Sequence, residues 1–231
     1  CAYLETWHLD VEEFLELRKN TGDDRRRTHD MNTANWIPDL FMKRVKDDGQ
    51  WSMFDPSVAP QLTDLFGEAF EAEYIRLEDE GKFTDQVPAR KIYARMMKTL
   101  AETGNGWMTF KDTCNTRCNS AVDGYVVHSS NLCTEIVEPT FAGKKERIKR
   151  DEYTPAQAES SRVIGYDATT DELEVMTDGE VAVCNLGSVN LAKYVTADGK
   201  VDYRKLRKNV ATAVKFLDRV IDRNFYPVPE A

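Results

Sequence analysis

The sequence predicts a mixed α/β protein whose N-terminal half is rich in helices. Apolar side chains recur at helical spacing through most of residues 10–103, which predicts a series of amphipathic helices. After the helix stop at Gly104-Asn105-Gly106 the pattern becomes mixed, with short apolar runs of strand type and one hairpin pattern. The 231 residues, 41% of them hydrophobic, suffice for one sizeable core or two small ones.

Four helices are expected in the N-terminal half. The first begins at Asp10, which is predicted to cap it, with Glu13 three positions later as a variant of the capping box. The other three are expected at about residues 37–46, 62–80 and 88–103, where apolar positions repeat every three or four residues. The polar stretch between the first two helices has no apolar period and is expected to form a loop.

Strand patterns occur at both ends of the helical region and again in the C-terminal half. Residues 2–7 and 107–110 are short aromatic and aliphatic runs of strand type. Residues 125–136 and 181–186 have the composition of buried strands, and residues 161–176 alternate as a hairpin does. The C-terminal half is therefore expected to contain several strands.

A long helix is predicted near the C-terminal end, with Asp202 as its cap. Its apolar side chains are spaced by four and three residues, a stripe that fits packing against a sheet. They are Leu206, Val210, Ala213, Leu217, Val220 and Ile221.

The composition excludes several classes of protein. Forty acidic side chains against 31 basic ones leave a net charge of -9, which disfavours a general affinity for nucleic-acid phosphates. No apolar run approaches the roughly 20 residues that a membrane-spanning helix needs. Nucleic acid and membrane are therefore not expected as partners.

Five cysteines (Cys1, Cys114, Cys118, Cys133 and Cys184) form an odd set with wide spacings. This pattern argues against a disulfide scaffold and for a reducing compartment, so a cytoplasmic protein is expected. No signal peptide is expected, because the first residues already have the pattern of packed structure. A chain that opens on a strand and stops at Pro227-Val228-Pro229-Glu230-Ala231 is expected to be a piece of a longer protein.

The segment SSNLCTEI, residues 129–136, holds the best candidate for chemistry. In an extended strand alternate side chains share a face, so Asn131, Cys133 and Glu135 would point one way, spaced by about 6 to 7 Å. An amide, a thiol and a carboxylate are costly to bury unless they face a cavity, which favours a functional site. The alternative is a structural strand with a core cysteine, since free cysteine is among the most buried residue types.

Several longer segments carry a family resemblance. They are NLCTEI and VAVCNLGSVNL around Cys133 and Cys184, the opening AYLETWHLDVEEFLELRKNTG, the stretch NWIPDLFMKRV and the ending FYPVPEA. Together, in this order and across nearly the whole chain, they resemble the large catalytic subunit of class I ribonucleotide reductase. The Asn-Leu-Cys form resembles class I enzymes, because the cobalamin-dependent class usually has Asn-Pro-Cys at this place.

The resemblance implies roles for four residues. Cys133 would be the thiyl-radical residue that removes the 3' hydrogen of a ribonucleotide, and Glu135 would be the base for the 3' hydroxyl. Asn131 would hydrogen-bond the substrate hydroxyls, and Cys184 would be one of two redox-active thiols that reduce the 2' carbon. These roles suit the groups, since a positioned carboxylate can act as a general base and a dithiol supplies two electrons by forming a disulfide.

The resemblance also implies a fold and partners. The chain would be one partial catalytic domain, residues 1–231, of a ten-stranded α/β barrel with the radical cysteine on a central loop. The full subunit would reduce ribonucleoside diphosphates, bind ATP and deoxynucleotide effectors, form a homodimer and be re-reduced by thioredoxin or glutaredoxin. No cofactor would be bound by this chain, since a metal-containing small subunit would supply the radical. The chain alone, being incomplete, would be inactive.

Two departures from the family pattern limit this transfer. Thr6 stands where the family often has Pro. More seriously, Cys133 and Cys184 lie 51 positions apart, which is more than usual between these motifs. We therefore expect an inserted hairpin at about residues 142–179, which returns the chain to where it left. The basic run at residues 144–150 inside it is expected to be a solvated turn.

A zinc module is the alternative from another class of protein. Cys114 and Cys118, followed by His128 and Cys133, make up a ligand inventory that is compatible with a tetrahedral structural site. The chain would then be a binding or interaction module. This reading would use up the thiol that the radical chemistry needs.

Overall fold

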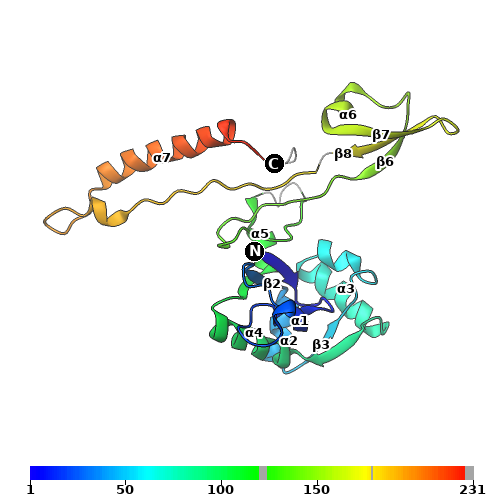
Figure 1. Ribbon diagram of the computed structural model, residues 1–231, viewed down its shortest axis with the longest axis horizontal. Coiled ribbons are helices and arrows are strands. Elements are labelled where there is room, and N and C mark those ends of the chain that lie inside the picture. Colours follow the sequence, from blue (N-terminus) through cyan, green and yellow to red (C-terminus); the bar gives the residue numbers. More distant parts are fainter. Residues whose placement is uncertain (120–123, 178, 227–231) are drawn as a thin grey trace. The chain divides into compact units, whose positions relative to one another are not determined.

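The computed structural model describes residues 1–119, 124–177 and 179–226 (Figure 1). The chain divides into two compact units, Cys1–Thr140 and Phe141–Ala231, and each is described by itself. The fold is mixed α/β, as expected. The strands of the described residues belong to three small sheets, and they do not close into a barrel. No helix in the described ranges is long and apolar enough to cross a membrane.

The first unit contains a three-stranded parallel sheet in the order β1-β2-β5. Its strands are β1 (Ala2–Glu5), β2 (Thr33–Ile37) and β5 (Trp107–Phe110). Both outer strands are confirmed, but the central strand β2 was missed, because its five residues lie between a polar loop and Pro38. All five are buried, as is typical of a parallel strand covered on both faces.

The remaining elements of the first unit connect and cover these strands. Helix α2 lies against α4, and β3 pairs with β4 in an antiparallel ribbon. The elements are α1 (Val11–Phe14), η1 (Asp24–Arg26), α2 (Asp39–Lys46), β3 (Gln50–Met53), η2 (Pro60–Asp64), α3 (Gly67–Asp79), β4 (Asp85–Pro88), α4 (Ala89–Thr103) and α5 (Lys111–Arg117).

Three of the four predicted N-terminal helices are confirmed as α2, α3 and α4, each beginning one or more residues later than expected. The helix expected from Asp10 onward is wrong in its length, because α1 has only four residues, about one turn. The Asp10 side chain makes no capping bond, and its backbone N–H donates to His8 Nδ1 at 3.1 Å. The loop expected before β2 contains the short turn η1, capped by Asp23.

An aromatic cluster forms the centre of the hydrophobic core in this unit. The Tyr74 ring of α3 stacks on Trp51 of β3 with 4.5 Å between centroids, and Phe54 meets Tyr74 edge-on at 5.2 Å. Phe41 of α2 lies edge-on to Trp51 at 5.0 Å. These four side chains are fully buried, so α2, α3 and the β3–β4 ribbon are held together chiefly by apolar and aromatic packing.

Helix α5 buries polar side chains against this core, and Lys111 is its most buried charge. The Lys111 ammonium donates to both carboxylate oxygens of Glu5 at 2.9 Å and to the carbonyls of Leu62 at 2.8 Å and Thr63 at 3.0 Å. Burial lowers the pKa of Lys111 and raises the pKa of Glu5, and the attraction between the two charges opposes both shifts. One ammonium thus joins β1, η2 and α5.

Asp112, the next residue, accepts hydrogen bonds from the starts of two helices. Its Oδ2 accepts the N–H of Asp39 at 2.8 Å and its Oδ1 accepts the N–H of Gly67 at 2.9 Å. These are the first residues of α2 and α3, whose N–H groups have no partner inside their helices. Gly67 has a φ of 60°, so the chain turns into α3 through a conformation that favours glycine.

The second unit contains an antiparallel sheet in the order β6-β8-β7 and a long helix. Strands β7 and β8 are the predicted hairpin, with a bulge between Val163 and Gly165. The elements are β6 (Lys145–Lys149), α6 (Pro155–Ser160), β7 (Ser161–Asp167), β8 (Glu172–Thr177), η4 (Leu191–Tyr194) and α7 (Tyr203–Arg223).

The basic run is not a turn but strand β6, which pairs with β8. Lys145 forms an ion pair with Glu174 at 2.6 Å and Lys149 with Glu172 at 3.4 Å. Opposite charges on neighbouring strands favour this pairing. The acidic partners lie more than twenty positions further along the chain, so the run itself does not reveal them.

Three further predictions for the C-terminal half are corrected or confirmed in part. Residues 125–136 and 181–186 form no strand. Asp202 caps α7 as expected, since its Oδ1 accepts the N–H of Lys205 at 2.9 Å. The expected packing of α7 on a sheet is not seen, because none of its residues is buried in the described structure. An apolar stripe shows which side of a helix can be covered, but it does not supply the covering element.

We predict that Asp112→Ala lowers the free energy of unfolding of the first unit by about 2 kcal/mol, because it leaves two helix N-termini without an acceptor. Urea unfolding followed by tryptophan fluorescence reports on this unit alone, since all four tryptophans lie within Cys1–Thr140. Asp23→Ala, which removes one exposed capping bond, is the matched control. A loss no greater than that of the control would contradict the double cap.

We predict that Lys111→Met costs about 3–5 kcal/mol, because it leaves the Glu5 carboxylate buried without a counter-charge. Adding Glu5→Gln removes that charge, so the double variant is expected to recover part of the stability. The same fluorescence measurement on both single variants and the double variant gives the coupling energy. A double variant whose loss equals the sum of the two single losses would show that the pair is not coupled.

Candidate active-site loop

The candidate residues lie in a loop, residues 127–137, that contacts α5 and its C-cap at both ends. The buried Asn115 side chain of α5 pairs both backbone groups of Val127. Its Nδ2 donates to the Val127 carbonyl at 3.0 Å, and its Oδ1 accepts the Val127 N–H at 2.7 Å. The amide thereby pairs the backbone groups that a neighbouring strand would pair in a sheet. Buried backbone groups must be paired, and here a side chain pairs them.

Two more contacts hold the loop on either side of its tip. His128 Nε2 lies 2.8 Å from Asp64 Oδ1 of η2, and the Cys118 thiol donates to the Val137 carbonyl at 3.4 Å. Since Asn115 and Cys118 are both at α5, this helix fixes where the loop leaves the core and where it returns.

Inside the loop, Asn131 folds the backbone into a turn. Its Oδ1 accepts the N–H of Ile136 at 3.1 Å, and its carbonyl accepts the N–H of Thr134 at 3.2 Å. Thr134 has a φ of 68°, which an extended strand does not allow. The expectation that Asn131, Cys133 and Glu135 share one face of a strand is therefore wrong, because asparagine side chains compete with strand pairing by satisfying the backbone locally.

The structure places the four predicted site residues as follows. Asn131, Cys133 and Glu135 lie in this one loop, with Cys133 and Glu135 exposed and Asn131 partly buried. Cys184 belongs to the second unit, where its side chain is partly buried.

Glu135 lines a pocket that Cys133 does not reach. This pocket of about 380 Å³ lies between α5 and residues 135–138, and Cys114, Arg117 and Cys118 also line it. Burial, and in second place the neighbouring Cys118, raise the pKa of the Cys114 thiol. Glu135 therefore shares a pocket with two cysteines that the sequence pattern offered only as zinc ligands.

The zinc module receives no support from the geometry. Among the residues that the structure describes, no three His, Cys, Asp or Glu side chains gather as metal ligands. His128 pairs with Asp64, and Cys118 donates to a backbone carbonyl. The spacing in the sequence suggested a tetrahedral set, but the side chains point to different partners.

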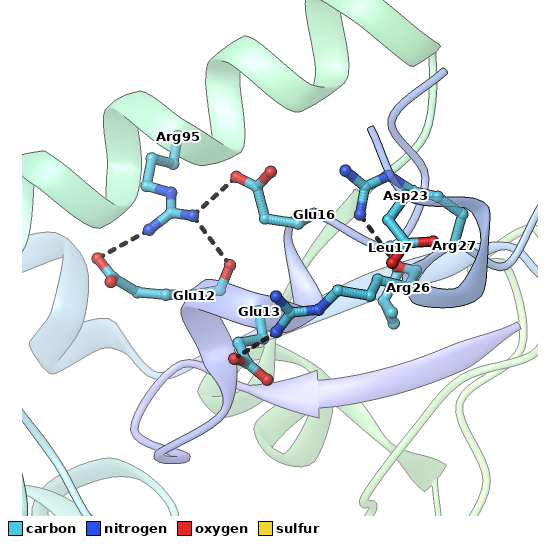
Figure 2. Close-up of a pocket in the computed structure, with 8 residues that line it drawn as sticks. All are labelled: Glu12, Glu13, Glu16, Leu17, Asp23, Arg26, Arg27 and Arg95. Carbon is cyan, nitrogen blue, oxygen red and sulfur yellow. Dashed lines mark hydrogen bonds and ion pairs between the residues drawn. The ribbon is translucent and has the colours of Figure 1, made fainter. Parts of the chain in front are cut away.

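A second, more charged pocket lies away from the loop, between α1, residues 23–27 and α4 (Figure 2). Arg95 of α4 reaches Glu12 at 3.0 Å and Glu16 at 2.7 Å, and Arg26 pairs with Glu13 at 3.1 Å. Carboxylates thus pair with Arg95 and Arg26, while the third arginine of the pocket, Arg27, donates to the backbone carbonyls of Thr21 and Arg26.

Sequence reasoning missed the groups that hold the loop: Asn115, Asp64 and Tyr3, whose phenol donates to the Asn131 carbonyl at 3.0 Å. A signal existed for one of them. Lys111, Asp112 and Asn115 follow a predicted strand at helical spacing, and three polar residues on one short helix need partners if that helix is buried.

Comparison with known proteins identifies the family. The family model described as "Ribonucleotide reductase, barrel domain" matches residues 1–231. The chain is 45% identical over 236 residues to the ribonucleoside-diphosphate reductase subunit alpha of Chlamydia muridarum, covering 100% of this chain and 19% of that protein. The chain is 37% identical over 248 residues to the ribonucleoside-diphosphate reductase subunit alpha of Helicobacter pylori strain J99, and the match covers 98% of this chain and 31% of that protein. The chain is 40% identical over 231 residues to the ribonucleoside-diphosphate reductase large subunit of Danio rerio, and the match covers 100% of this chain and 24% of that protein.

The chain thus spans between about a fifth and a third of the length of these relatives. The Asn-Leu-Cys loop and the elements that hold it lie within the matched region. On the match of all 231 residues, the chain belongs to the ribonucleotide reductase barrel-domain family.

Proposed function

We propose that this chain is part of the large catalytic subunit of a class I ribonucleotide reductase. The full subunit reduces ribonucleoside diphosphates to 2'-deoxyribonucleoside diphosphates for DNA precursor synthesis. Support comes from the family match over the whole chain and from relatives that are named ribonucleoside-diphosphate reductase. The observation that carries the proposal is the loop itself, which presents the Cys133 thiol at an exposed tip and is anchored on both sides to α5.

The proposed roles follow from the chemistry of the loop side chains. Cys133, as a thiyl radical, takes the 3' hydrogen atom, and the exposed Glu135 carboxylate accepts the proton of the 3' hydroxyl. Asn131 hydrogen-bonds the substrate hydroxyls. In the structure its side-chain oxygen accepts the Ile136 N–H, which leaves the side-chain NH2 group to act as a donor.

Reduction at the 2' carbon needs two electrons, which we assign to Cys184 and a second thiol outside this chain. The two thiols become a disulfide in each turnover, and thioredoxin or glutaredoxin reduces it. A metal-containing small subunit supplies the radical, and this chain binds no cofactor of its own. The full subunit is a cytoplasmic homodimer that binds ATP and deoxynucleotide effectors, and β1, β2 and β5 are part of its ten-stranded barrel.

In the full-length subunit, Cys133→Ser is expected to abolish deoxynucleotide formation, because a hydroxyl cannot replace a thiol as a carrier of hydrogen atoms. Cys184→Ser is the paired variant and is expected to block reduction at the 2' carbon while the 3' hydrogen is still removed. Turnover with a dithiol reductant and loss of tritium from the 3' position separate the two steps. Retained turnover in Cys133→Ser would contradict the assignment, and normal turnover in Cys184→Ser would remove that residue from the mechanism.

We further propose that residues 142–179 are an insertion that contributes no catalytic group. Support comes from the residues at its two ends. Phe141 and Glu180 exchange both backbone hydrogen bonds, at 3.0 and 2.9 Å, so the segment leaves and returns at one point. Within it, Lys145 and Lys149 of β6 are paired with acidic side chains of β8. A self-contained sheet that closes on its own base can be removed without displacing what flanks it.

Replacing residues 142–179 by Asn-Gly is expected to leave turnover of the full-length subunit within about threefold of the wild type. The pair Phe141–Glu180 has the geometry that a two-residue hairpin turn requires, and Asn-Gly is the preferred turn sequence. Turnover per folded subunit is measured after thermal melting has shown normal folding. A folded variant that loses more than roughly tenfold, about 1.4 kcal/mol of barrier, would show that the segment takes part in the reaction.

A further inference from the structure

Tyr3 of β1 connects the parallel sheet to the loop that carries Cys133. Its backbone is fixed by parallel pairing with β2, where Tyr3 lies opposite Ala34. Its ring meets the buried Trp36 edge-on, with 5.8 Å between the ring centroids. Both contacts belong to the most regular part of the first unit, so the position of the phenol is set by the sheet and not by the loop.

The phenol of Tyr3 donates a hydrogen bond to the Asn131 carbonyl at 3.0 Å. The same carbonyl accepts the Thr134 N–H at 3.2 Å, and these two residues enclose Leu132 and Cys133. The Asn131 carbonyl thus accepts one hydrogen bond from Tyr3 of the sheet. Its second hydrogen bond, from the Thr134 N–H, closes the turn that contains Cys133. Loss of the Tyr3 hydroxyl would keep the Thr134–Asn131 hydrogen bond of the turn but remove the hydrogen bond that joins the turn to β1.

The surroundings keep this phenol protonated. Burial raises the pKa of Tyr3 above its ordinary value, and hydrogen bonding with the Thr109 and Ser130 side chains opposes the shift. Cys114 and Cys133 lie close enough that a negative charge on either would raise the pKa further. A tyrosine whose pKa lies above 10 is neutral at physiological pH, so it remains a hydrogen-bond donor throughout the working range.

We propose that Tyr3 is a positioning residue that fixes the tip of the Cys133 loop relative to the β1-β2-β5 sheet. The proposal rests on the proposed function, in which the thiol must approach the 3' carbon of the substrate. Hydrogen-atom transfer is sensitive to small displacements of the reacting atoms. A hydrogen bond to a substrate hydroxyl, the role proposed for Asn131, tolerates a wider range of distances and angles. Tyr3 should therefore influence kcat and leave KM nearly unchanged.

The test is Tyr3→Phe in the full-length subunit, which keeps the ring on Trp36 and removes only the hydroxyl. Two quantities are measured: steady-state kinetics, and hydrogen exchange of the peptide that covers residues 128–138. We expect exchange of this peptide to become at least threefold faster, with no change in the β1 and β2 peptides. We also expect kcat to fall about tenfold, with KM within twofold of the wild type.

Tyr74→Phe is the matched control. It removes a buried phenol hydroxyl from the same unit, where it donates to the Ser52 carbonyl at 2.8 Å and accepts the Ser52 N–H at 2.7 Å. This variant is expected to lower the melting temperature without faster exchange in residues 128–138. A general loss of stability would accelerate exchange in both variants, whereas a specific anchor affects only Tyr3→Phe.

Unchanged exchange of the loop peptide in Tyr3→Phe would overturn the proposal, and so would an unchanged kcat in a variant whose loop exchange has risen. Faster exchange in the Tyr74→Phe control to the same extent would also overturn it. Failure of the proposed function gives a different result: the wild-type full-length subunit would then lack reductase activity, while the exchange measurement would still show whether Tyr3 holds the loop.

Discussion

The buried ion pair between Lys111 and Glu5 is the constraint on which the first unit depends. An ammonium inside a protein is tolerated only when it is fully paired, and four oxygens from β1 and η2 surround this one. That requirement places α5 against the sheet and brings Asp112 to the starts of α2 and α3. The apolar core alone would allow these elements to slide against one another, because the hydrophobic effect has no direction, whereas the polar contacts of α5 have fixed geometry.

The same helix sets the position of the Cys133 loop. Asn115 and Cys118 hold residues 127 and 137, so a segment without regular secondary structure is attached to a rigid element at two points. Functional side chains are commonly carried on loops that a scaffold positions. The Cys133 thiol is exposed on this loop, as the proposed contact with a substrate requires.

The second unit is stabilised in a different way. Its sheet pairs the basic strand β6 with acidic positions of β8, and the charges that suggested a turn in the sequence become cross-strand ion pairs. The helix α7 has a clear apolar side, on which Val214 and Ile221 are more than half exposed.

The sequence by itself determined the family, most of the helices, both outer strands of the parallel sheet and the hairpin, because these depend on local periodicity and on continuous motifs. It also picked out Asn131, Cys133, Glu135 and Cys184, whose roles remain proposals. Only the tertiary structure decided that the Cys133 segment is a loop and that β2 is the central strand. The reason is physical, because Thr33–Ile37 and residues 125–136 have similar apolar content but different hydrogen-bond partners. The backbone of β2 pairs with a strand on each side, whereas the Val127 backbone pairs with the Asn115 side chain. Asn115 and Val127 are more than ten positions apart in the sequence, so no local pattern predicts that they pair.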